Sequence, residues 1–189
     1  MRGDCWFVRS PLGMVCLRAR DGALTGLSFC EKEAVEVSPE TAPPVVRRAM
    51  VWVADYFRGQ FRPPDFPIAP WGTPFQLRVW SALSGLGPGE TRSYGEVAAA
   101  LGCGSARAVG QALGRNPLLL LIPCHRVIGA NGQLGGYAGG LARKRALLTL
   151  EGAHLLSAST APTPVHSSAS VSSLRLRNYI VDGSAGPSA

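Results

Sequence analysis

A run of prolines between residues 62 and 74 divides the chain into two parts with different hydrophobic patterns; it comprises Pro63, Pro64, Pro67, Pro70 and Pro74. Proline lacks a backbone N–H and fixes its own φ angle, so neither a helix nor a central strand continues through such a run. We therefore expect an irregular connector with a domain boundary near residue 70. The first domain is then residues 1–70, and the second is residues 71–156.

The first part shows the pattern of short antiparallel strands followed by a helix. Two turn sequences, Ser10-Pro11-Leu12-Gly13 and Asp21-Gly22, separate three apolar segments, which predicts strands at 5–9, 14–18 and 24–29. Apolar residues then recur at helical spacing and predict a helix over 44–58; they are Val45, Val46, Ala49, Val53 and Tyr56. We expect an α/β domain with a small, mostly antiparallel sheet.

The second part shows mainly helical signals, beginning with a helix predicted over 75–86. Ser93-Tyr94-Gly95-Glu96 is a capping box that opens a helix through Leu101. After the turn Gly102-Cys103-Gly104, Ser105 caps another helix that runs to about Gly114. Two short helices across a glycine-containing turn are typical of a helix-turn-helix and also of ordinary helix packing, so the pattern alone leaves DNA binding open.

The remaining segments complete an α+β fold class. The apolar run Leu118–Ile122 predicts a buried strand, and a glycine-rich loop over 132–140 leads to a last helix near 141–150. Residues 157–189 are rich in Ser, Pro and Ala. We expect a disordered tail there, because such a composition buries too little apolar area to offset the chain entropy.

The net charge favours an acidic partner. Nineteen Lys and Arg against twelve Asp and Glu give +7, and arginine, whose forked donors suit phosphate, far outnumbers lysine. A basic surface also serves solubility, so charge by itself does not establish nucleic-acid binding.

No stretch approaches the roughly 20 apolar residues that span a bilayer, and the N-terminus lacks a signal-peptide pattern. We expect no membrane association and a cytoplasmic location, or a nuclear one in a eukaryote.

The most informative segment for chemistry is Ile122-Pro123-Cys124-His125-Arg126-Val127. The five cysteines are odd in number and contain no Cys-x-x-Cys pair, which argues against a disulfide scaffold or a zinc ribbon. Cys124 instead lies beside a histidine that can generate its thiolate, the nucleophilic form of cysteine. From the residues alone, this pair is compatible with a structural role, with a cysteine hydrolase or with group transfer.

This segment resembles the active-site signature of the methylated-DNA–protein-cysteine methyltransferases, also called O6-alkylguanine-DNA alkyltransferases. Further segments resemble the family in order and spacing: Ser93–Ala98, Ala106–Gly110, Arg115–Pro117, Gly135–Tyr137, Gly139–Leu141 and Leu150–Gly152. The resemblance is close over 73–152, whereas 1–70 match only at Ser10–Gly13 and near 44–58. It implies an N-terminal ribonuclease-H-like domain and a mainly helical C-terminal domain with a winged-helix-like helix-turn-helix.

The resemblance also implies the roles of four catalytic residues. Cys124 would attack the alkyl carbon in a single displacement. His125, bridged through a water molecule to Glu151, would accept the thiol proton. Tyr94 would donate a proton or a hydrogen bond to the leaving guanine, offsetting the charge that develops on the ring.

Substrate-pocket roles follow from the same resemblance. The backbone carbonyls of Cys124 and Val127 would bind the exocyclic amine of guanine, and the loop Tyr137-Ala138-Gly139-Gly140 would offer a backbone amide to O6. Asn116 would join the turn before the active-site strand to the helix-turn-helix. Some relatives have proline where Leu119 stands here, which leaves the accepted size of the alkyl group open.

The resemblance assigns the second helix of the helix-turn-helix to the DNA minor groove. Arg107 would enter the base stack and fill the gap left by the flipped nucleotide. The small residues Ser105, Ala106 and Gly110 would permit close approach to DNA, and Arg115 would belong to the same surface.

The function implied is DNA repair by direct reversal. The chain would transfer a methyl or other alkyl group irreversibly from O6-alkylguanine, and from O4-alkylthymine, in double-stranded DNA to its own Cys124. We expect a monomer with neither cofactor nor metal. The zinc site that some relatives have in the N-terminal domain is not carried over, since all three histidines lie in the C-terminal half. The alternative is a non-catalytic sensor of alkylated DNA, which needs every feature except the cysteine.

Overall fold

The computed structural model describes residues 5–31 and 39–153. The tail predicted for 157–189 lies outside this part of the chain. Among the described residues, no helix combines the length and apolar character that a membrane crossing requires.

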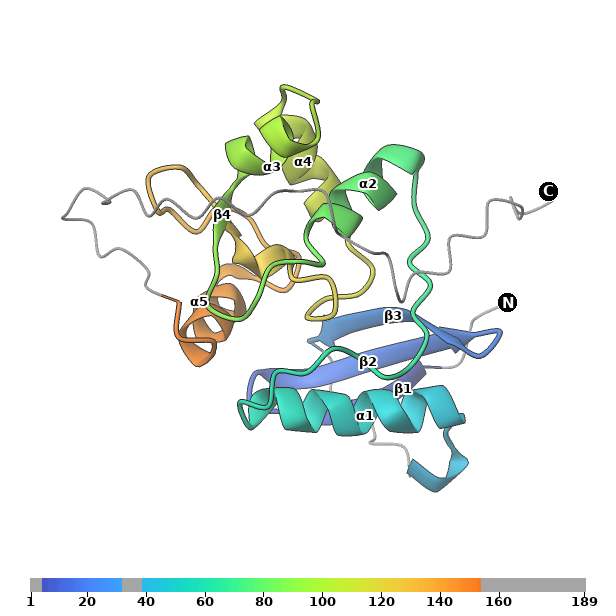
Figure 1. The fold of residues 1–189 in the computed structure, drawn as a ribbon. Helices are drawn as coiled ribbons and strands as arrows, with labels where there is room; N and C mark the ends of the chain where they lie inside the picture. The colour runs from blue at the N-terminus through green and yellow to red at the C-terminus, as the bar shows by residue number, and fades with distance from the viewer. Residues whose placement is uncertain (1–4, 32–38, 154–189) are drawn as a thin grey trace.

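A three-stranded antiparallel sheet with one helix on its face forms the N-terminal part (Figure 1). The elements are β1 (Cys5–Ser10), β2 (Gly13–Arg20), β3 (Ala23–Cys30) and α1 (Pro44–Phe57), with a 3-10 turn, η1 (Pro39–Thr41), before α1. Asp21 and Gly22 both have positive φ, as a two-residue hairpin turn requires. Val15 and Leu17 of β2 are fully buried in the core that α1 covers, so the expected sheet and helix are confirmed.

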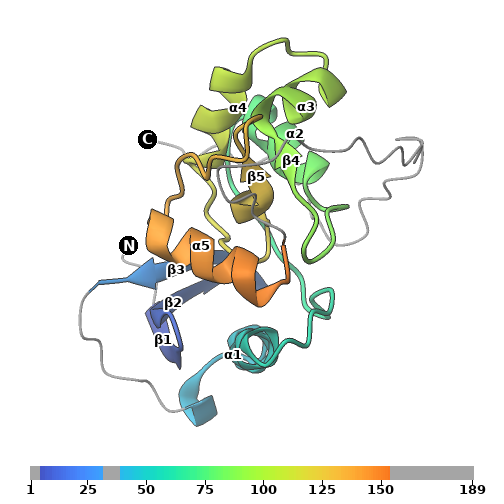
Figure 2. The same cartoon turned by 90° about the vertical axis from the view of Figure 1, so that its left-hand side faces the viewer.

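Helices dominate the C-terminal part, as expected. Its elements are α2 (Pro74–Ala82), β4 (Arg92–Ser93), α3 (Tyr94–Ala100), α4 (Ala106–Leu113), η2 (Cys124–Arg126), β5 (Val127–Ile128) and α5 (Leu141–Leu150). Thr73 and Ser93 open α2 and α3 with capping boxes. The predicted helix over 75–86 ends earlier, at Ala82. Helices α2, α3 and α4 gather at one end of the molecule, and α5 lies between them and the sheet (Figures 1 and 2).

The edge of β3 that faces away from β2 joins the two parts. Leu24 N donates to Pro67 O, and Ala69 N donates to Leu24 O, each at 2.9 Å. Farther along the same strand, Leu27 N donates to Pro117 O at 2.9 Å. The connector and the segment before Cys124 are therefore both tied to the sheet, and a single cluster of buried residues runs through both parts.

The prediction of a strand at Leu118–Ile122 is wrong. Leu118 forms one isolated bridge with Leu27, and the following residues turn back, with Ile122 N donating to Leu118 O at 2.9 Å. Leu120 has a φ of 69°, a conformation that no regular strand contains. Leu118, Leu119, Leu120 and Ile122 are nevertheless all buried. An apolar run therefore signalled burial, but it could not distinguish a buried strand from a buried turn.

Trp80 offers a test of this shared core. It is 1% exposed, and its Nε1 donates to Ala112 O at 3.0 Å, which ties α2 to α4. Trp80→Phe should lower the free energy of unfolding by about 1–3 kcal/mol, because the indole loses its hydrogen bond to Ala112 O, that carbonyl loses one of its donors, and a small void is left. Equilibrium unfolding in urea measures the change. Trp71→Phe is the matched control, since Trp71 is 76% exposed and should change the stability little.

Candidate active site

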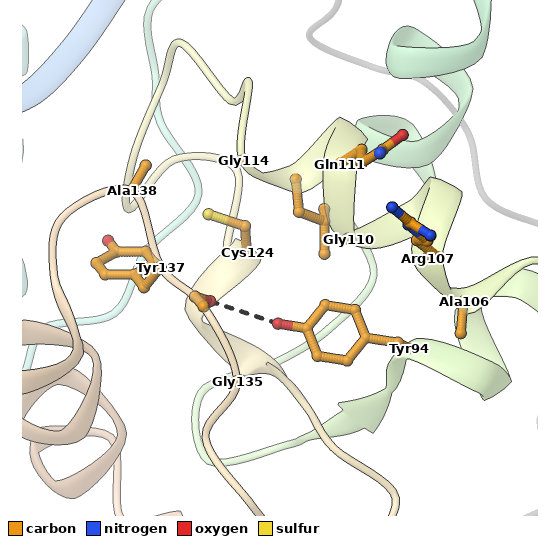
Figure 3. A pocket seen from close by; sticks show the side chains of 12 residues that line it. Tyr94, Ala106, Arg107, Gly110, Gln111, Gly114, Cys124, Gly135, Tyr137 and Ala138 are labelled. Carbon is orange, nitrogen blue, oxygen red and sulfur yellow. Dashed lines mark hydrogen bonds between the residues drawn. The ribbon is translucent and has the colours of Figure 1, made fainter.

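Cys124 lies at the wall of a pocket of about 710 Å³ between the helix-turn-helix and the glycine-rich loop (Figure 3). The residue opens the single turn η2, directly after Pro123, and is 4% exposed. The pocket is lined by Tyr94, Ala106, Arg107, Gly110, Gln111, Leu113, Gly114, Cys124, Gly135, Gly136, Tyr137 and Ala138. Residues far apart in the sequence thus converge on one thiol.

Asn116 holds the Cys124 thiol in place. Its Nδ2 donates to Cys124 Sγ at 3.0 Å and to Ile122 O at 2.9 Å, while its Oδ1 accepts from Leu118 N at 2.9 Å. One amide side chain therefore closes the buried turn and points a donor at the sulfur. Asn116 itself follows α4, with its backbone N donating to Leu113 O at 3.1 Å, so the turn is also attached to the helix-turn-helix.

The thiol is protonated at rest. Burial raises the pKa of Cys124 to about 11, although the Asn116 hydrogen bond and the charge of Lys144 act in the opposite direction. At neutral pH the sulfur therefore carries its proton, and a base must remove that proton when the thiol reacts.

His125, the residue after Cys124, forms a buried pair with Glu151. His125 Nε2 and Glu151 Oε1 are 2.9 Å apart, and both side chains are 0% exposed. The expected water bridge between them is wrong, because η2 and the end of α5 lie close enough for a direct hydrogen bond. Arg126 also donates to Glu151, from Nε at 2.8 Å and from Nη2 at 2.6 Å.

Charge and hydrogen bonds determine which ring nitrogen of His125 can accept a proton. Burial alone would raise the pKa of Glu151, but hydrogen bonds from Arg126 and His125 lower it to about 2, so Glu151 is a carboxylate that only accepts. His125 Nε2 must then carry the hydrogen, which leaves Nδ1 with a free lone pair. Burial lowers the pKa of His125, so the ring is neutral. Nδ1 is buried and has no hydrogen-bond partner within residues 5–31 and 39–153.

Tyr94 lies opposite Cys124 in the pocket (Figure 3). It begins α3, and its hydroxyl donates to Gly136 O at 3.4 Å. Gly135 has positive φ, and a Cβ there would lie 2.8 Å from the tyrosine oxygen, so a glycine is required beside the ring. Burial and the nearby Cys124 raise the pKa of Tyr94, so the phenol keeps its proton and remains a donor.

Two basic residues that the sequence analysis missed complete the site. Lys144 is 0% exposed, and its Nζ donates to Val127 O at 2.6 Å and to Gly136 O at 3.3 Å; burial lowers its pKa to about 8. The spacing of Lys144 from the buried Leu147 and Leu148 could have signalled it, since i+3 and i+4 neighbours share a helix face. Arg126 was noted from the sequence only as a member of the segment 122–127, and its hydrogen bonds to Glu151 were not predicted.

Lys144 also affects the predicted contact between guanine and the backbone carbonyls of Cys124 and Val127. Val127 O already accepts from Lys144, and Cys124 O accepts from Val127 N. Each carbonyl keeps a second lone pair, so contact with the exocyclic amine of guanine stays a prediction. Val127 is fully buried and does not line the pocket.

The glycine-rich loop is fastened to the N-terminal sheet by Arg143 of α5. Its Nε donates to Leu12 O at 2.8 Å, and its Nη1 donates to Gly139 O at 3.1 Å. The guanidinium also lies 4.9 Å from the centre of the Phe29 ring, a cation–π arrangement. The expected substrate loop, with Tyr137 and Ala138 in the pocket wall, is therefore positioned by the sheet.

The expected DNA-binding residues divide into two groups. Ala106, Arg107 and Gly110 of α4 line the pocket together with Tyr94. Ser105 caps α4, accepting from Ala108 N at 3.2 Å, and does not line the pocket. Arg115 follows α4 and also lies outside the pocket lining, as does Asn116, which was predicted to belong to the substrate pocket. Within the described residues, no three His, Cys, Asp or Glu side chains are placed to hold a metal ion.

Comparison with known proteins decides the family. The sequence model of a protein family, the DNA-binding domain of 6-O-methylguanine DNA methyltransferase, matches residues 74–153. A methylated-DNA–protein-cysteine methyltransferase of Mycolicibacterium paratuberculosis is 45% identical over 150 residues, which cover 78% of this chain and 91% of that protein. This chain belongs to the methylated-DNA–protein-cysteine methyltransferase family.

Other members of this methyltransferase family agree in sequence and in structure. A protein of the same name from Methanosarcina acetivorans is 44% identical over 147 residues, covering 76% of this chain and 94% of that one. The crystal structure of Mycobacterium tuberculosis OGT in complex with DNA has a TM-score of 0.69 and 44% identity over 78% of this chain and 91% of that one. The resemblance and the α+β fold class inferred from the sequence are thus confirmed.

Asn116 provides a test of how this methyltransferase site controls its thiol. Asn116→Ala should raise the pKa of Cys124 above about 11, because the sulfur loses its amide donor. It should also lower the free energy of unfolding by about 1–3 kcal/mol, since Leu118 N loses its acceptor and Ile122 O loses one of its two donors. The rate of Cys124 alkylation by iodoacetamide against pH, resolved by peptide mass spectrometry, measures the first effect.

The control is Asn131→Ala, whose amide oxygen accepts from Gln133 N in an exposed turn. This control should leave both the alkylation profile and the stability unchanged. Equal alkylation rates for Asn116→Ala and the unmodified protein at every pH would show that the amide has no influence on the thiol.

Proposed function

We propose that this chain repairs DNA by moving the alkyl group of O6-alkylguanine onto Cys124 in one irreversible step. The relatives bear the name methylated-DNA–protein-cysteine methyltransferase, and a similar structure is a complex with DNA, which supports alkyl transfer from DNA to a protein cysteine. The observation that carries the proposal is a single pocket wall on which the thiol, a phenol donor and an arginine-bearing helix meet.

The identity of the acceptor follows from that pocket. Cys5, Cys16, Cys30 and Cys103 also lie in the described part of the chain and form no disulfide there, but none of them lines the pocket. Cys124 is also the cysteine that adjoins a buried histidine–carboxylate pair. We therefore assign the transfer to Cys124.

The proposed step moves one proton and one alkyl group. His125 takes up the thiol proton, and the sulfur then attacks the alkyl carbon as the bond from that carbon to O6 breaks. Negative charge develops on the departing guanine, and the protonated Tyr94 offsets it by donating a hydrogen bond or its proton. The product is a thioether, which water does not cleave under mild conditions, so each chain acts once.

The substrate base must leave the duplex to reach this pocket. Flipping a nucleotide costs a few kcal/mol, and a planar cation that stacks in the vacated space is suited to offset that cost. Arg107 lies on α4 at the pocket lining, next to the small residues Ala106 and Gly110. We propose that α4 enters the minor groove of double-stranded DNA. We also propose that the chain acts as a monomer and that O4-alkylthymine is a second substrate.

Stoichiometry and the acceptor are tested together. A tenfold excess of duplex oligonucleotide with one O6-methylguanine should add the mass of one methyl group per chain, with no later turnover. Cys124→Ser should abolish the gain and keep most of the DNA affinity, because affinity comes mainly from phosphate contacts. Intact-protein mass spectrometry and fluorescence anisotropy measure the two properties.

Cys103→Ser serves as the control and should react like the unmodified protein. No mass gain in the unmodified protein, with the DNA still bound, would replace the proposal by a sensor of alkylated DNA. Repeated turnover would instead indicate a hydrolase.

The role of Arg107 is tested with two substrates. Arg107→Ala should slow transfer from duplex DNA by about tenfold or more while leaving transfer from free O6-alkylguanine nearly unchanged, because the free base needs no flipping. Single-turnover rates with both substrates give the comparison. Arg115→Ala is the control, because Arg115 lies outside the pocket, and it should weaken DNA binding without this difference. Equal losses on both substrates would show that Arg107 supports the fold.

A further inference from the structure

Tyr56 of α1 reaches the active site from the N-terminal part of the chain. It lies outside residues 74–153, the segment that the DNA-binding-domain model matches. Its side chain is nevertheless buried, at 2% exposure. Its hydroxyl donates to Glu151 Oε1 and lies 3.4 Å from His125 Nε2. One phenol therefore contacts both members of the pair that the proposed mechanism uses.

The surroundings of Tyr56 keep this hydroxyl in one place. Three aromatic rings pack around it, with ring centres at 5.4 Å for Trp52, 5.5 Å for Phe57 and 5.2 Å for Phe61. Burial and the charge of Glu151 raise the pKa of Tyr56 far above its ordinary value, so the phenol stays protonated and can only donate to the carboxylate. The donor is thus fixed in position and in protonation state.

The oxygen that Tyr56 binds is the one that faces His125. Glu151 Oε1 accepts from Tyr56, from His125 Nε2 and from Arg126 Nη2, whereas Oε2 accepts from Arg126 Nε. A donor on Oε1 stabilises the carboxylate and competes for the lone pairs that bind the histidine hydrogen. It therefore weakens the pull of Glu151 on that ring and fixes the direction in which the carboxylate points.

We propose that Tyr56 is a positioning residue of the alkyl transfer: its hydroxyl holds the Glu151 carboxylate against His125 Nε2 and keeps His125 neutral, with Nδ1 as the acceptor. The inference rests on the proposed function, in which His125 takes the proton of Cys124. It gives the N-terminal part a direct role in the chemistry of the C-terminal part.

Several ionisable groups face His125, and the test must change only one of them. They are Glu151 and Lys144 from α5 and its end, Arg126 and Cys124 from η2, Tyr137 from the glycine-rich loop, and Tyr56 from α1. Tyr56→Phe removes the hydroxyl and keeps the ring and the net charge. It is therefore the cleanest single change.

The first measurement is the pH dependence of the single-turnover rate on alkylated duplex DNA, between about pH 5 and pH 9. In Tyr56→Phe, Glu151 should attract the histidine proton more strongly, so His125 should protonate more easily. The acid limb of the profile should move up by about half to one pH unit, and the rate in the alkaline plateau should change only about threefold or less. An equal loss at every pH would mean that Tyr56 only supports the fold.

Trp52→Phe is the matched control on the same helix. Trp52 stacks on Tyr56, but its Nε1 donates to Arg62 O at 2.8 Å and not to Glu151. It should change the stability about as much as Tyr56→Phe and leave the acid limb in place. A shift of the limb in both variants would overturn the proposal, because any disturbance of α1 would then have the same effect.

A second measurement does not depend on the transfer reaction. Nitrogen-15 NMR of labelled histidine, assigned with His125→Asn, gives the pKa and tautomer of His125 in the free protein. The unmodified protein should show a hydrogen on Nε2, and Tyr56→Phe should show a higher pKa. If the unmodified protein fails to accept an alkyl group, the proposed function fails, and this titration still decides the role of Tyr56.

The coupling through Glu151 is tested by a double variant. In a Glu151→Gln background, adding Tyr56→Phe should produce no further change in the pKa of His125, because the carboxylate that connects the two is gone. A full additional shift would contradict a pathway through Glu151. In the unmodified protein, the Tyr56 hydroxyl proton should also exchange slowly with water, so rapid exchange would contradict the proposal even if a variant failed to fold.

Discussion

The active site depends on the buried carboxylate of Glu151 and on the hydrogen bonds that it accepts. An isolated charge in the interior costs several kcal/mol, so Glu151 is stable there only with its donors in place. Those donors are Arg126 and His125 from η2 and Tyr56 from α1. Arg126 Nη1 also donates to Leu86 O, which adds the segment after α2. Separate segments must therefore assemble before the charge is satisfied, and their assembly fixes the position of the His125 ring, one residue after Cys124.

The edge of β3 supplies the second constraint. The strand pairs with the connector at Leu24 and with the segment before Cys124 at Leu27. These pairings use backbone groups that an open sheet edge would otherwise leave unpaired. The sheet thereby sets how α1, and with it Tyr56, lies relative to the buried turn that precedes Cys124. The N-terminal part is therefore structurally continuous with the active site, although it lies outside residues 74–153, which the DNA-binding-domain model matches.

Local signals in the sequence predicted much of the structure, and long-range contacts account for what they missed. The three N-terminal strands, α1, the capping box at Ser93 and the turn between α3 and α4 depend on neighbours a few residues apart, and the structure contains them. The motif around Cys124 indicated the chemistry. Tyr56 was read as one more apolar residue of a helix face, because its partner Glu151 is 95 residues away. Leu118–Ile122 was misread because burial in a turn and burial in a strand select the same residues.

The state of Cys124 in the folded protein explains why such a site is built around a separate base. A thiol with a pKa of about 11 is almost entirely protonated at neutral pH. A thiolate would react with any alkylating agent or oxidant that reached the pocket, and under the proposed single-turnover reaction such a chain would be lost without repairing DNA. Burial keeps the sulfur protonated, and neutral His125 holds a nitrogen that can accept a proton. In the proposed reaction, the sulfur reacts when an alkyl carbon lies against it and Tyr94 can neutralise the departing base, so we attribute selectivity to the arrangement of the site rather than to an activated thiol.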